Sequence, residues 1–494
     1  MTPGPNLDLT GPIPDPDQLG RVHFIGIGGA GMSGIARIML ARGLPVTGSD
    51  AKDSAGLAAL RALGATVQVG HRAAQVVGAG TVVVSTAVRP NNPELVAARA
   101  DGIPVLHRSQ ALAAVMRGRR GIAVGGTAGK TTTTSMIAVA LQHCGADPSF
   151  AIGGELAEGG ANAHDGTGEV FVAEADESDG SFLLYHPEVA VVTNVEPDHL
   201  DFYGTAEAVE TAFADFCATV TPGGLIVACL DDPGARRIVE QAADGAAARG
   251  VQIIGYGRAG DAAVRVEGLR ATAIGVSCTL VDAHGPVDLQ LRVPGEHNGL
   301  NAAAAYGAIT GLGFDRHLTA AGLAGFGGTR RRFELRGQAG GVRVVDDYAH
   351  HPTKVAAALA AARSVVGSGR VLAVFQPHLY SRTRIFAADF GRALGLADEV
   401  VVMDVYAARE DPEPGVTGAL VAAEVPLPAE RVSYQPSWSR VAAQVVGRAR
   451  PGDLVLTIGA GDVTMLGPEI LEQLRTASQS GGPTGSGPSG HRPG

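Results

Sequence analysis

Lysine is almost missing from this sequence. Among its 494 residues the only lysines are Lys52, Lys130 and Lys354, and arginine supplies all the other members of the 39 basic side chains. This bias is typical of a GC-rich genome and by itself says little about function. The formal net charge is −10, which argues against general binding to nucleic acid or to a membrane surface. Any polyanionic ligand must therefore be held by local clusters of positive charge.

Cysteines and long apolar runs are also scarce. The sequence has no Cys-x-x-Cys pair, and its four cysteines lie far apart, so neither a zinc site nor a disulfide framework is expected. No stretch of about 18 uninterrupted apolar residues occurs, which predicts the absence of a membrane span. The N-terminal residues lack the basic region and the apolar segment of a signal peptide. These absences predict a cytoplasmic protein with reduced thiols.

The length of the chain predicts several domains, because one hydrophobic core does not extend over 494 residues. Short apolar strands alternate with Ala-rich helical stretches, which is typical of α/β domains with parallel sheets covered by helices. We predict three such domains, over residues 20–116, 117–328 and 329–475. Short β-rich runs between Val251 and Val293 indicate a small antiparallel insertion in the second domain. The two ends, residues 1–19 and the Gly/Ser/Pro-rich residues 476–494, are predicted to be disordered.

A first glycine-rich loop lies in residues 23–36, "HFIGIGGAGMSGIA". Gly26, Gly28 and Gly31 match the Gly-x-Gly-x-x-Gly fingerprint of dinucleotide-binding proteins, and Asp50 follows where the ribose-binding carboxylate of that fold is expected. Taken alone, this loop indicates an NAD enzyme.

A second glycine-rich loop, "VGGTAGKTTTT", follows a predicted strand and precedes a predicted helix. It is a Walker A loop one residue short, since Val124 stands where the first glycine is expected. The physical requirements are still met: glycines let backbone amides turn toward phosphate oxygens, and the helix offers its positive end. Lys130 can then reach the β- and γ-phosphates, and the Thr131 hydroxyl can bind Mg²⁺. The alternative is a tight strand–helix turn that happens to contain a lysine.

Acidic clusters follow the next two predicted strands, at the sheet edge where ligands bind in open α/β folds. Their members are Glu174, Asp176, Glu177 and Asp179 in the first cluster, and Asp198, His199 and Asp201 in the second. Each cluster alone is typical of a solvated loop. Behind a phosphate loop, at least one member is expected to hold the Mg²⁺ of a nucleoside triphosphate.

The third predicted domain carries "DDYAHHP" and "FQPHLYSRTR" at two strand ends. Arg382 and Arg384 are suited to bidentate contact with a carboxylate or a phosphate. The segment "TRRRFELR" concentrates positive charge near the domain junction, where it could grip ATP. The alternatives are structural histidines and a solvated basic linker.

Together these features change the interpretation of the first loop. Its domain shows no constellation for hydride transfer, and the same glycine geometry can bind the diphosphate of a nucleotide sugar. Two anion-binding loops and a third domain predict an enzyme that joins two substrates at the expense of ATP.

The order of the motifs resembles the Mur ligase family over nearly the whole chain, roughly residues 20–474. The similar segments include "HFIGIGGAGMSGIA", "GTAGKTTTT", "EADESDGSF", "TNVEPDHLDFY", "PGEHNGLNAAAA", "TRRRFE", "DDYAHHP", "FQPHLYSRT", "VYAARE" and "GAGDV". The resemblance implies a Rossmann-like UDP-sugar-binding domain, a central P-loop ATPase-like domain and a C-terminal Rossmann-like α/β domain that binds the amino acid. It implies an ATP- and Mg²⁺-dependent ligase of peptidoglycan synthesis that joins L-alanine to the carboxylate of UDP-N-acetylmuramate through an acyl phosphate, as a monomer or homodimer.

The resemblance also implies roles for individual residues. The residues implied to bind ATP are Gly126, Thr127, Ala128, Gly129, Lys130, Thr131 and Thr132, with Asn298 and Asn301 at the adenine and Arg331 and Asp347 near the phosphates. Those implied to bind the UDP-sugar are Gly28, Gly29, Ala30, Gly31 and His71. Those implied to contact alanine are Tyr348, His350 and Arg382. Thr131, Glu174 and His199 would hold Mg²⁺, Lys130 would act on the phosphoryl group, and either His199 or His350 would be the base.

The sequence departs from the family pattern at several positions. Many relatives have histidine where this chain has Ala128 and arginine where it has Leu379. The second difference removes one candidate ligand for the carboxylate of the amino acid, so Arg382 becomes the main candidate. Several sister ligases use a carbamylated lysine in the central domain, but residues 131–328 contain no lysine here. Three rival interpretations remain: a dehydrogenase, a non-catalytic nucleotide-binding module, and a sister ligase that adds a peptide or another amino acid.

Overall fold

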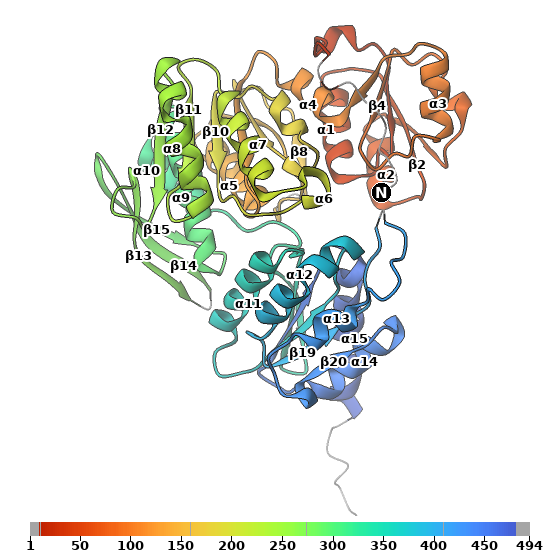
Figure 1. Cartoon of the computed structure of the whole chain (residues 1–494), viewed down its shortest axis with the longest axis vertical. Helices are drawn as coiled ribbons and strands as arrows, with labels where there is room; N and C mark the ends of the chain where they lie inside the picture. The colour runs from red at the N-terminus through yellow and green to blue at the C-terminus, as the bar shows by residue number, and fades with distance from the viewer. Residues whose placement is uncertain (1–8, 10, 159, 273, 409, 481–494) are drawn as a thin grey trace, which may run out of the picture. The chain divides into compact units, whose positions relative to one another are not determined.

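The computed structural model describes residues 9, 11–158, 160–272, 274–408 and 410–480. The chain forms two compact units, residues 1–330 and 331–494 (Figure 1). The first unit contains two β-sheets and the second unit contains one. All three sheets are largely parallel and carry helices, so the predicted α/β fold class is confirmed. The predicted domain boundaries at 116/117 and 328/329 stay predictions.

The first sheet is parallel and has the strand order β3-β2-β1-β4-β5, which is the order of a Rossmann fold without its sixth strand. Its strands are β1 (Val22–Ile25), β2 (Val46–Asp50), β3 (Thr66–Val69), β4 (Thr81–Val84) and β5 (Val105–His107). Its helices are α1 (Ala30–Ala41), α2 (Ala55–Ala62), α3 (Pro93–Ala100) and α4 (Arg108–Met116), with a short 3₁₀ turn η2 (Ala73–Val76). The central strands β1 and β4 are buried along their whole length, as expected where helices cover both faces of a parallel sheet.

The second sheet has ten strands in the order β15-β14-β13-β12-β11-β10-β6-β9-β7-β8. The strands are β6 (Arg120–Gly125), β7 (Ser149–Ala151), β8 (Ala163–His164), β9 (Val170–Glu174), β10 (Val189–Val192), β11 (Leu225–Cys229), β12 (Gln252–Gly257), β13 (Val264–Thr272), β14 (Gly275–Asp282) and β15 (Gly285–Leu291). The helices are α5 (Lys130–His143), α6 (Leu200–Tyr203), α7 (Ala206–Ala218), α8 (Pro233–Ala248), α9 (Glu296–Gly311) and α10 (Arg316–Ala324), and two 3₁₀ turns, η3 (Glu177–Asp179) and η4 (Ser181–Leu184), follow β9.

The predicted antiparallel insertion is an extension of this sheet. Strands β13, β14 and β15 pair antiparallel with one another, but β13 also pairs in parallel with β12. Figure 1 shows the three strands beside α9 and α10. Tyr306 of α9 donates its hydroxyl to Asp282 at the end of β14 (2.6 Å), and apolar side chains of α9 and β14 belong to one core. Strands β13, β14 and β15 therefore share a hydrophobic core with β6 and α5, the elements on either side of the second glycine-rich loop.

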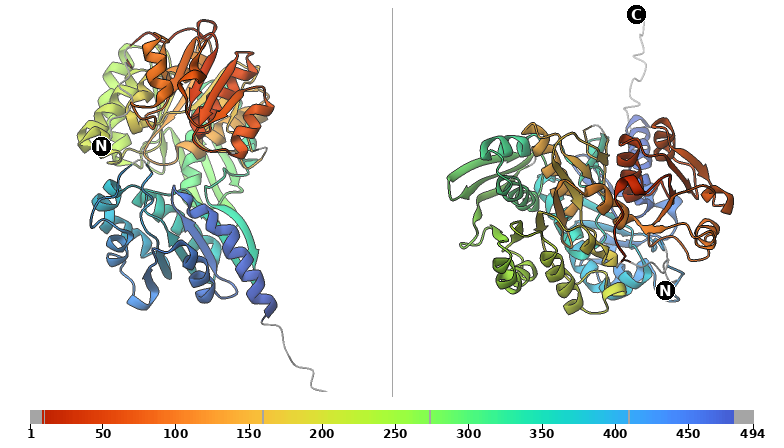
Figure 2. Two further views of the ribbon diagram at one scale, coloured as in Figure 1. Left: turned by 90° about the vertical axis from the view of Figure 1, so that its right-hand side faces the viewer. Right: turned by 90° about the horizontal axis from the view of Figure 1, so that it is seen from above.

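The second unit has a six-stranded sheet in the order β16-β17-β21-β18-β19-β20. Its elements are β16 (Glu334–Ala339), β17 (Val342–Asp347), α11 (Pro352–Val366), β18 (Val371–Phe375), α12 (Tyr380–Leu394), β19 (Glu399–Val402), α13 (Gly418–Ala423), η5 (Ala429–Arg431), β20 (Val432–Tyr434), α14 (Trp438–Arg448), β21 (Leu454–Ile458), η6 (Asp462–Met465) and α15 (Leu466–Ser480). Only the β16–β17 pair is antiparallel in this sheet. Helices α11, α12 and α13 pack on one face, and α14 and α15 on the other; Figure 2 shows α15 as the long blue helix beside the sheet.

The predictions for the two ends need correction where the structure describes them. Leu19 is buried in the first core and its carbonyl accepts a hydrogen bond from Thr81 (2.8 Å), so the disorder predicted for 1–19 does not extend to Leu19. Helix α15 continues to Ser480, and within it the hydroxyls of Thr476 and Ser478 donate to carbonyls four residues earlier. Residues 1–8, 10 and 481–494 lie outside the described residues. Within the described ranges, no helix combines the length and apolarity needed to cross a membrane.

Candidate functional site

The second glycine-rich loop joins β6 to α5, as predicted. Gly126 and Gly129 have φ angles of 135° and 87°, a region that side chains other than glycine disfavour. Space demands glycine as well: a Cβ on Gly129 would lie 2.6 Å from Asn301 Oδ1. The loop therefore turns tightly into α5, whose first amides have no partners within the helix. This is the geometry of a phosphate-binding helix terminus.

Asn194 holds this loop in place, and sequence reasoning missed it. Its carbonyl accepts from the amide of Thr127 (3.0 Å), and its side chain Oδ1 accepts from the amide of Ala128 (2.7 Å). Asn194 is thus the hydrogen-bond partner of both amides, and the ATP contacts predicted for residues 126–132 stay predictions. The only signal in the sequence is the position of Asn194 just after a strand, in "TNVEPDH".

Lys130, the first residue of α5, forms an ion pair with Glu177 of η3. The Lys130 Nζ–Glu177 Oε2 distance is 2.7 Å, and both side chains are largely buried. Burial acts to lower the pKa of Lys130, but Glu177, Asp176 and Glu174 outweigh it and raise the pKa. Lys130 is therefore a stable cation at the phosphate loop. Tyr203 of α6 donates its hydroxyl to the Glu177 carbonyl (2.6 Å) and fixes that turn.

The predicted metal ligands Thr131 and Glu174 lie together. The Thr131 hydroxyl donates to Glu174 Oε1 (2.9 Å), and the amide of Gly153 donates to Oε2 (2.8 Å). A hydroxyl and a carboxylate at a phosphate loop fit Mg²⁺, which takes few protein ligands and completes its shell with water and phosphate oxygens. In the described part of the chain, no group of three or more His, Cys, Asp or Glu side chains is arranged to hold a metal ion.

His199, the third predicted ligand, is joined by its contacts to Glu177 and not to Glu174. Its Nε2 lies 3.8 Å from both Glu177 Oε1 and Asp198 Oδ2. Its backbone is left-handed, with φ of 54°, and its buried Nδ1 has no hydrogen-bond partner among the described residues. An unusual backbone and an unsatisfied buried nitrogen are features of functional positions. The side chain of Asp201 lies outside the described part of the structure.

The first glycine-rich loop joins β1 to α1 and is fastened to β2. The carbonyl of Ser49 accepts from the amides of Gly26 (2.8 Å) and Ile27 (3.0 Å). The carboxylate of Asp50 accepts from the amide of Gly28 (2.9 Å), so Asp50 supports the loop itself. Gly29, Ala30 and Gly31 then form the N-terminal end of α1, where an anion is stabilised.

His71, predicted to serve the same ligand, is connected to this loop through Ser49. Its Nδ1 lies 3.0 Å from Ser49 Oγ. Its second neighbour is Glu94 of α3, at 3.6 Å, a residue that sequence reasoning also missed. The structure therefore brings His71 and the first loop together at one edge of the first sheet.

Arg108 lies between the first glycine-rich loop and the acidic turn that follows β9. A Cβ on Gly31 would lie 3.4 Å from Arg108 Nη1, while Arg108 Nη2 donates to Asp176 Oδ2 (2.7 Å). Burial acts to lower the pKa of Arg108, but Asp176, Tyr185 and Asp179 outweigh it and raise the pKa. Burial acts to raise the pKa of Asp176, but Arg108 and Lys130 outweigh it and lower the pKa, so both cations act on the acidic turn. Sequence reasoning missed Arg108, which follows β5 as the first residue of α4.

Asn298 and Asn301, predicted at the adenine, lie on α9 against the phosphate loop. Asn301 Nδ2 donates to Asn298 Oδ1 (3.2 Å), and Asn298 Nδ2 donates to the carbonyl of Pro294 (2.7 Å). Both side chains are buried. The contact of Asn301 with Gly129 places the pair beside the second loop.

In the second unit, the predicted phosphate ligand Arg331 is bound within its own unit. Its Nε donates to the buried carboxylate of Asp346 (3.1 Å), and its Nη2 donates to the carbonyl of Gly459 (2.8 Å). Asp347 accepts from the amides of Phe333 (2.8 Å) and Ala349 (2.8 Å). Burial raises the pKa of Asp347 to about 6 although Arg332 opposes the rise. These contacts fix the turn at 331–333, and the predicted contacts of Arg331 and Asp347 with ATP stay predictions.

The predicted amino-acid contacts lie at the carboxyl edge of the same sheet. Tyr348 and His350 follow β17, and their rings meet edge to face with centroids 5.3 Å apart. His350 Nδ1 lies 3.0 Å from the carbonyl of Tyr348, and its ring is 6.0 Å from that of His378. Arg382 is buried in the first turn of α12, which follows β18.

Comparison with known proteins matches three parts of the chain to models of one family. They are the Mur ligase family catalytic domain over residues 21–120, the Mur ligase middle domain over 124–309 and the Mur ligase glutamate ligase domain over 331–461. This chain belongs to the Mur ligase family.

Similar proteins carry a more specific description. A UDP-N-acetylmuramate–L-alanine ligase from Kineococcus radiotolerans is 61% identical over 461 residues, which are 92% of this chain and 97% of that protein. One from Saccharopolyspora erythraea is 59% identical over 93% of this chain and 94% of that protein. The crystal structure of UDP-N-acetylmuramate-alanine ligase from Thermotoga maritima superposes with a TM-score of 0.77 at 28% identity, covering 92% of this chain and 99% of that chain.

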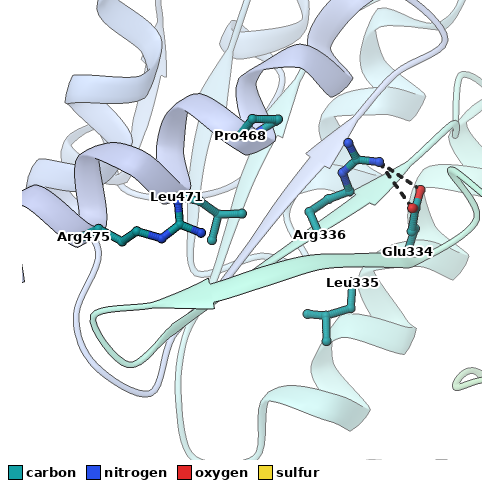
Figure 3. Close-up of a pocket in the computed structure, with 6 residues that line it drawn as sticks. All are labelled: Glu334, Leu335, Arg336, Pro468, Leu471 and Arg475. Carbon is teal, nitrogen blue, oxygen red and sulfur yellow. Dashed lines mark hydrogen bonds and ion pairs between the residues drawn. The ribbon is translucent and has the colours of Figure 1, made fainter.

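Two features of this Mur ligase do not belong to the predicted site. Leu379, where many relatives have arginine, is buried, has a φ angle of 71° and donates its amide to the carbonyl of Tyr406 (3.0 Å). A hollow of about 250 Å³ in the second unit is lined by Glu334, Leu335, Arg336, Pro468, Leu471 and Arg475 (Figure 3). None of these six residues is a predicted site residue, and the Arg336 guanidinium there is paired with Glu334.

Proposed function

We propose that this protein is an ATP-dependent ligase that joins L-alanine to the carboxylate of UDP-N-acetylmuramate, a step in the synthesis of peptidoglycan precursors. The reaction forms an amide bond and belongs to the acid–amino-acid ligases. ATP is a substrate, Mg²⁺ is the metal, and the protein acts in the cytoplasm, where both nucleotides are available. A monomer or a homodimer stays a prediction.

The observation that supports this proposal most directly is the position of Arg108 between the first loop and the acidic turn that holds Lys130. One side of its guanidinium faces Gly31, and the other is bound to Asp176, whose neighbour Glu177 holds Lys130. An enzyme that phosphorylates one bound nucleotide derivative with another needs two phosphate sites at such close range. A dehydrogenase or a binding module would need neither the second loop nor Arg108 at this position.

In the first half-reaction the substrate carboxylate attacks the γ-phosphorus of ATP, and ADP leaves. Lys130 and the first amides of α5 neutralise charge on the phosphoryl oxygens, which is the main protein contribution to such a transfer. Thr131 and Glu174 would hold Mg²⁺, which when bound supplies further charge neutralisation. The product is an acyl phosphate. Its phosphate is a good leaving group, whereas the oxygen of the free carboxylate is a poor one.

In the second half-reaction the alanine amine attacks the acyl carbon, and phosphate leaves through a tetrahedral intermediate. The amine must lose a proton, and either His350 or His199 is proposed to accept it. The carbonyl of Tyr348 can only accept a hydrogen bond, so His350 Nδ1 carries the proton and Nε2 is the basic nitrogen. Arg382 is proposed to bind the alanine carboxylate.

A steady-state assay of phosphate release tests the proposal. With ATP, Mg²⁺ and UDP-N-acetylmuramate present, L-alanine should give the highest kcat/KM among the amino acids. The sister-ligase alternative predicts that a peptide substrate, tested in the same assay, releases phosphate faster than L-alanine. Absence of phosphate release with every amino acid and peptide would overturn the proposal.

A further inference from the structure

Glu94 is a fully buried carboxylate beside the first glycine-rich loop. It lies in the first turn of α3, and its side chain has no exposed surface. Burying a carboxylate is costly unless hydrogen bonds and opposite charges compensate. A carboxylate without exposed surface therefore requires an explanation.

The contacts of Glu94 divide into two groups. On one side its Oε2 lies 3.2 Å from Nε2 of His23, a buried residue of β1. On the other side it contacts the segment that carries His71: Oε1 accepts from the amide of Arg72 (3.2 Å) and lies 3.6 Å from His71 Nδ1. Burial acts to raise the pKa of Glu94, but the hydrogen bonds from His23 and Ser49 outweigh it and lower the pKa. Glu94 is therefore ionised.

Ser49 connects Glu94 to His71 and fixes the tautomer of the histidine. The Ser49 hydroxyl donates its one proton to Glu94 Oε2 (2.6 Å). Its oxygen must then accept from His71 Nδ1, 3.0 Å away. His71 Nδ1 thus carries a proton and is turned inward, so Nε2 is the nitrogen on the ligand-binding edge.

The same serine holds the glycine-rich loop. Its carbonyl accepts from the amides of Gly26 and Ile27, so the loop and the ring of His71 are fixed to one residue of β2. We propose that Glu94 is a positioning residue for UDP-sugar binding, acting through Ser49 to direct His71 Nε2 toward the diphosphate. This inference rests on the proposed function, since it takes the ligand of the first loop to be a UDP-sugar.

A merely structural role for Glu94 is the competing explanation, because the carboxylate also ties β1 to α3. A double-mutant cycle separates the two. The affinity for UDP-N-acetylmuramate is measured by titration calorimetry for the wild type, Glu94→Gln, His71→Ala and the double variant. Thr81→Val, which removes the buried hydrogen bond from Thr81 to the carbonyl of Leu19 in the same domain, is the control for lost stability.

If Glu94 acts through His71, Glu94→Gln weakens binding about tenfold, the typical cost of one charge-assisted hydrogen bond. In the His71→Ala background the same change has no further effect, and the KM for ATP stays within twofold in all variants. Thr81→Val lowers the melting temperature but leaves the affinity unchanged. Ser49→Ala repeats the cycle if Glu94→Gln does not fold.

Unchanged affinity in Glu94→Gln, or losses that multiply in the double variant, would overturn the inference. In that event a wild type that binds UDP-N-acetylmuramate leaves the proposed function standing. A wild type that binds no UDP-N-acetylmuramate would overturn both.

Discussion

Lys130 and Glu177 form a buried ion pair at the phosphate loop, with 2.7 Å between Nζ and Oε2. ATP bound at this loop would present its phosphates to the same cation. The two anions therefore compete for Lys130, and ATP binding would change the partners of Glu177. Removal of the lysine also leaves Glu177 buried with an uncompensated charge, so a loss of activity and a loss of stability are expected together.

Lys130→Ala is expected to lower kcat at saturating ATP by roughly a hundredfold or more. One oriented charge on the transferred phosphoryl group supplies a few kcal/mol of transition-state stabilisation, and each 1.36 kcal/mol is about tenfold in rate. The measurement is phosphate release at saturating substrates.

The double variant Lys130→Ala/Glu177→Gln separates catalysis from stability. Neutralising Glu177 should recover much of the melting temperature that Lys130→Ala loses, because no unpaired charge remains buried. The rate should stay low. An unaltered kcat in the single variant would contradict the role of Lys130.

Glu174→Gln is expected to raise the Mg²⁺ concentration needed for half-maximal activity. The Glu174 carboxylate accepts a hydrogen bond from the Thr131 hydroxyl (2.9 Å). An amide is a much weaker ligand for Mg²⁺ than a carboxylate. Titration of activity with Mg²⁺ at fixed ATP gives the comparison. Glu155→Gln, which removes a half-exposed ion pair with Arg330 in the same unit, should leave the Mg²⁺ requirement as it is.

The first loop is expected to bind UDP-N-acetylmuramate and not NAD(P)H, although its sequence matches the dinucleotide fingerprint. Asp50, the carboxylate expected on the ribose, accepts a hydrogen bond from Gly28 of the loop. Calorimetric titration of the whole protein with each ligand tests this expectation. Tight NAD(P)H binding that UDP-N-acetylmuramate fails to displace would be decisive against it.

The fold was predictable from the sequence where periodicity is strong. Helix α1 and strand β6 begin within a residue or two of the positions that the glycine-rich loops indicate. The parallel pairing of β13 with β12 was not predictable, because hairpin periodicity is the same in an insertion and in an extended sheet. The helical residues up to Ser480 were missed because Ser and Thr signal loops unless their hydroxyls bond back along a helix.

The sequence predicted the motifs of the candidate site, but not the contacts between side chains of different elements. Lys130, Thr131 and Glu174 each lie beside a recognisable loop or strand end. Glu94 and Arg108 lie in ordinary helical sequence, and only tertiary packing brings them to His71 and Asp176. For Arg331 the basic run in the sequence was recognised, but the partner of the side chain was not, since the sequence does not reveal that its guanidinium is bound to Asp346.

Stability is expected to fall as the pH drops from about 6.5 toward 4, in part because of His107. Its Nδ1 accepts from the amide of Ser109 (3.3 Å), so the folded protein requires the neutral ring. Burial lowers the pKa of His107 to about 4, although Asp179 opposes this. The unfolded chain takes up a proton below about 6.5, which favours unfolding by roughly 3 kcal/mol once the pH reaches 4.

Urea unfolding at several pH values tests this expectation with wild type and His107→Asn. The variant keeps a side chain able to cap α4 but cannot titrate, so its stability should decline less over this range. The comparison is needed because the charges of Asp179, Arg108 and Asp176 also act on the ring. Identical pH slopes for the two proteins would show that His107 makes no contribution.

No carbamylated lysine is expected in this enzyme, in contrast to several sister ligases that use one in the central domain. After Lys130 the next lysine is Lys354, in α11 of the second unit, so the central domain has no second lysine to modify. Lys130 itself is held as a cation by Glu177. Arginine cannot take its place, because its guanidinium stays protonated and does not attack CO₂.

Activity should therefore be insensitive to bicarbonate after CO₂ depletion, and intact mass spectrometry under non-acidic conditions should show no CO₂ adduct. Activity restored by bicarbonate, together with an adduct mapped to Lys354, would show that this reasoning is wrong.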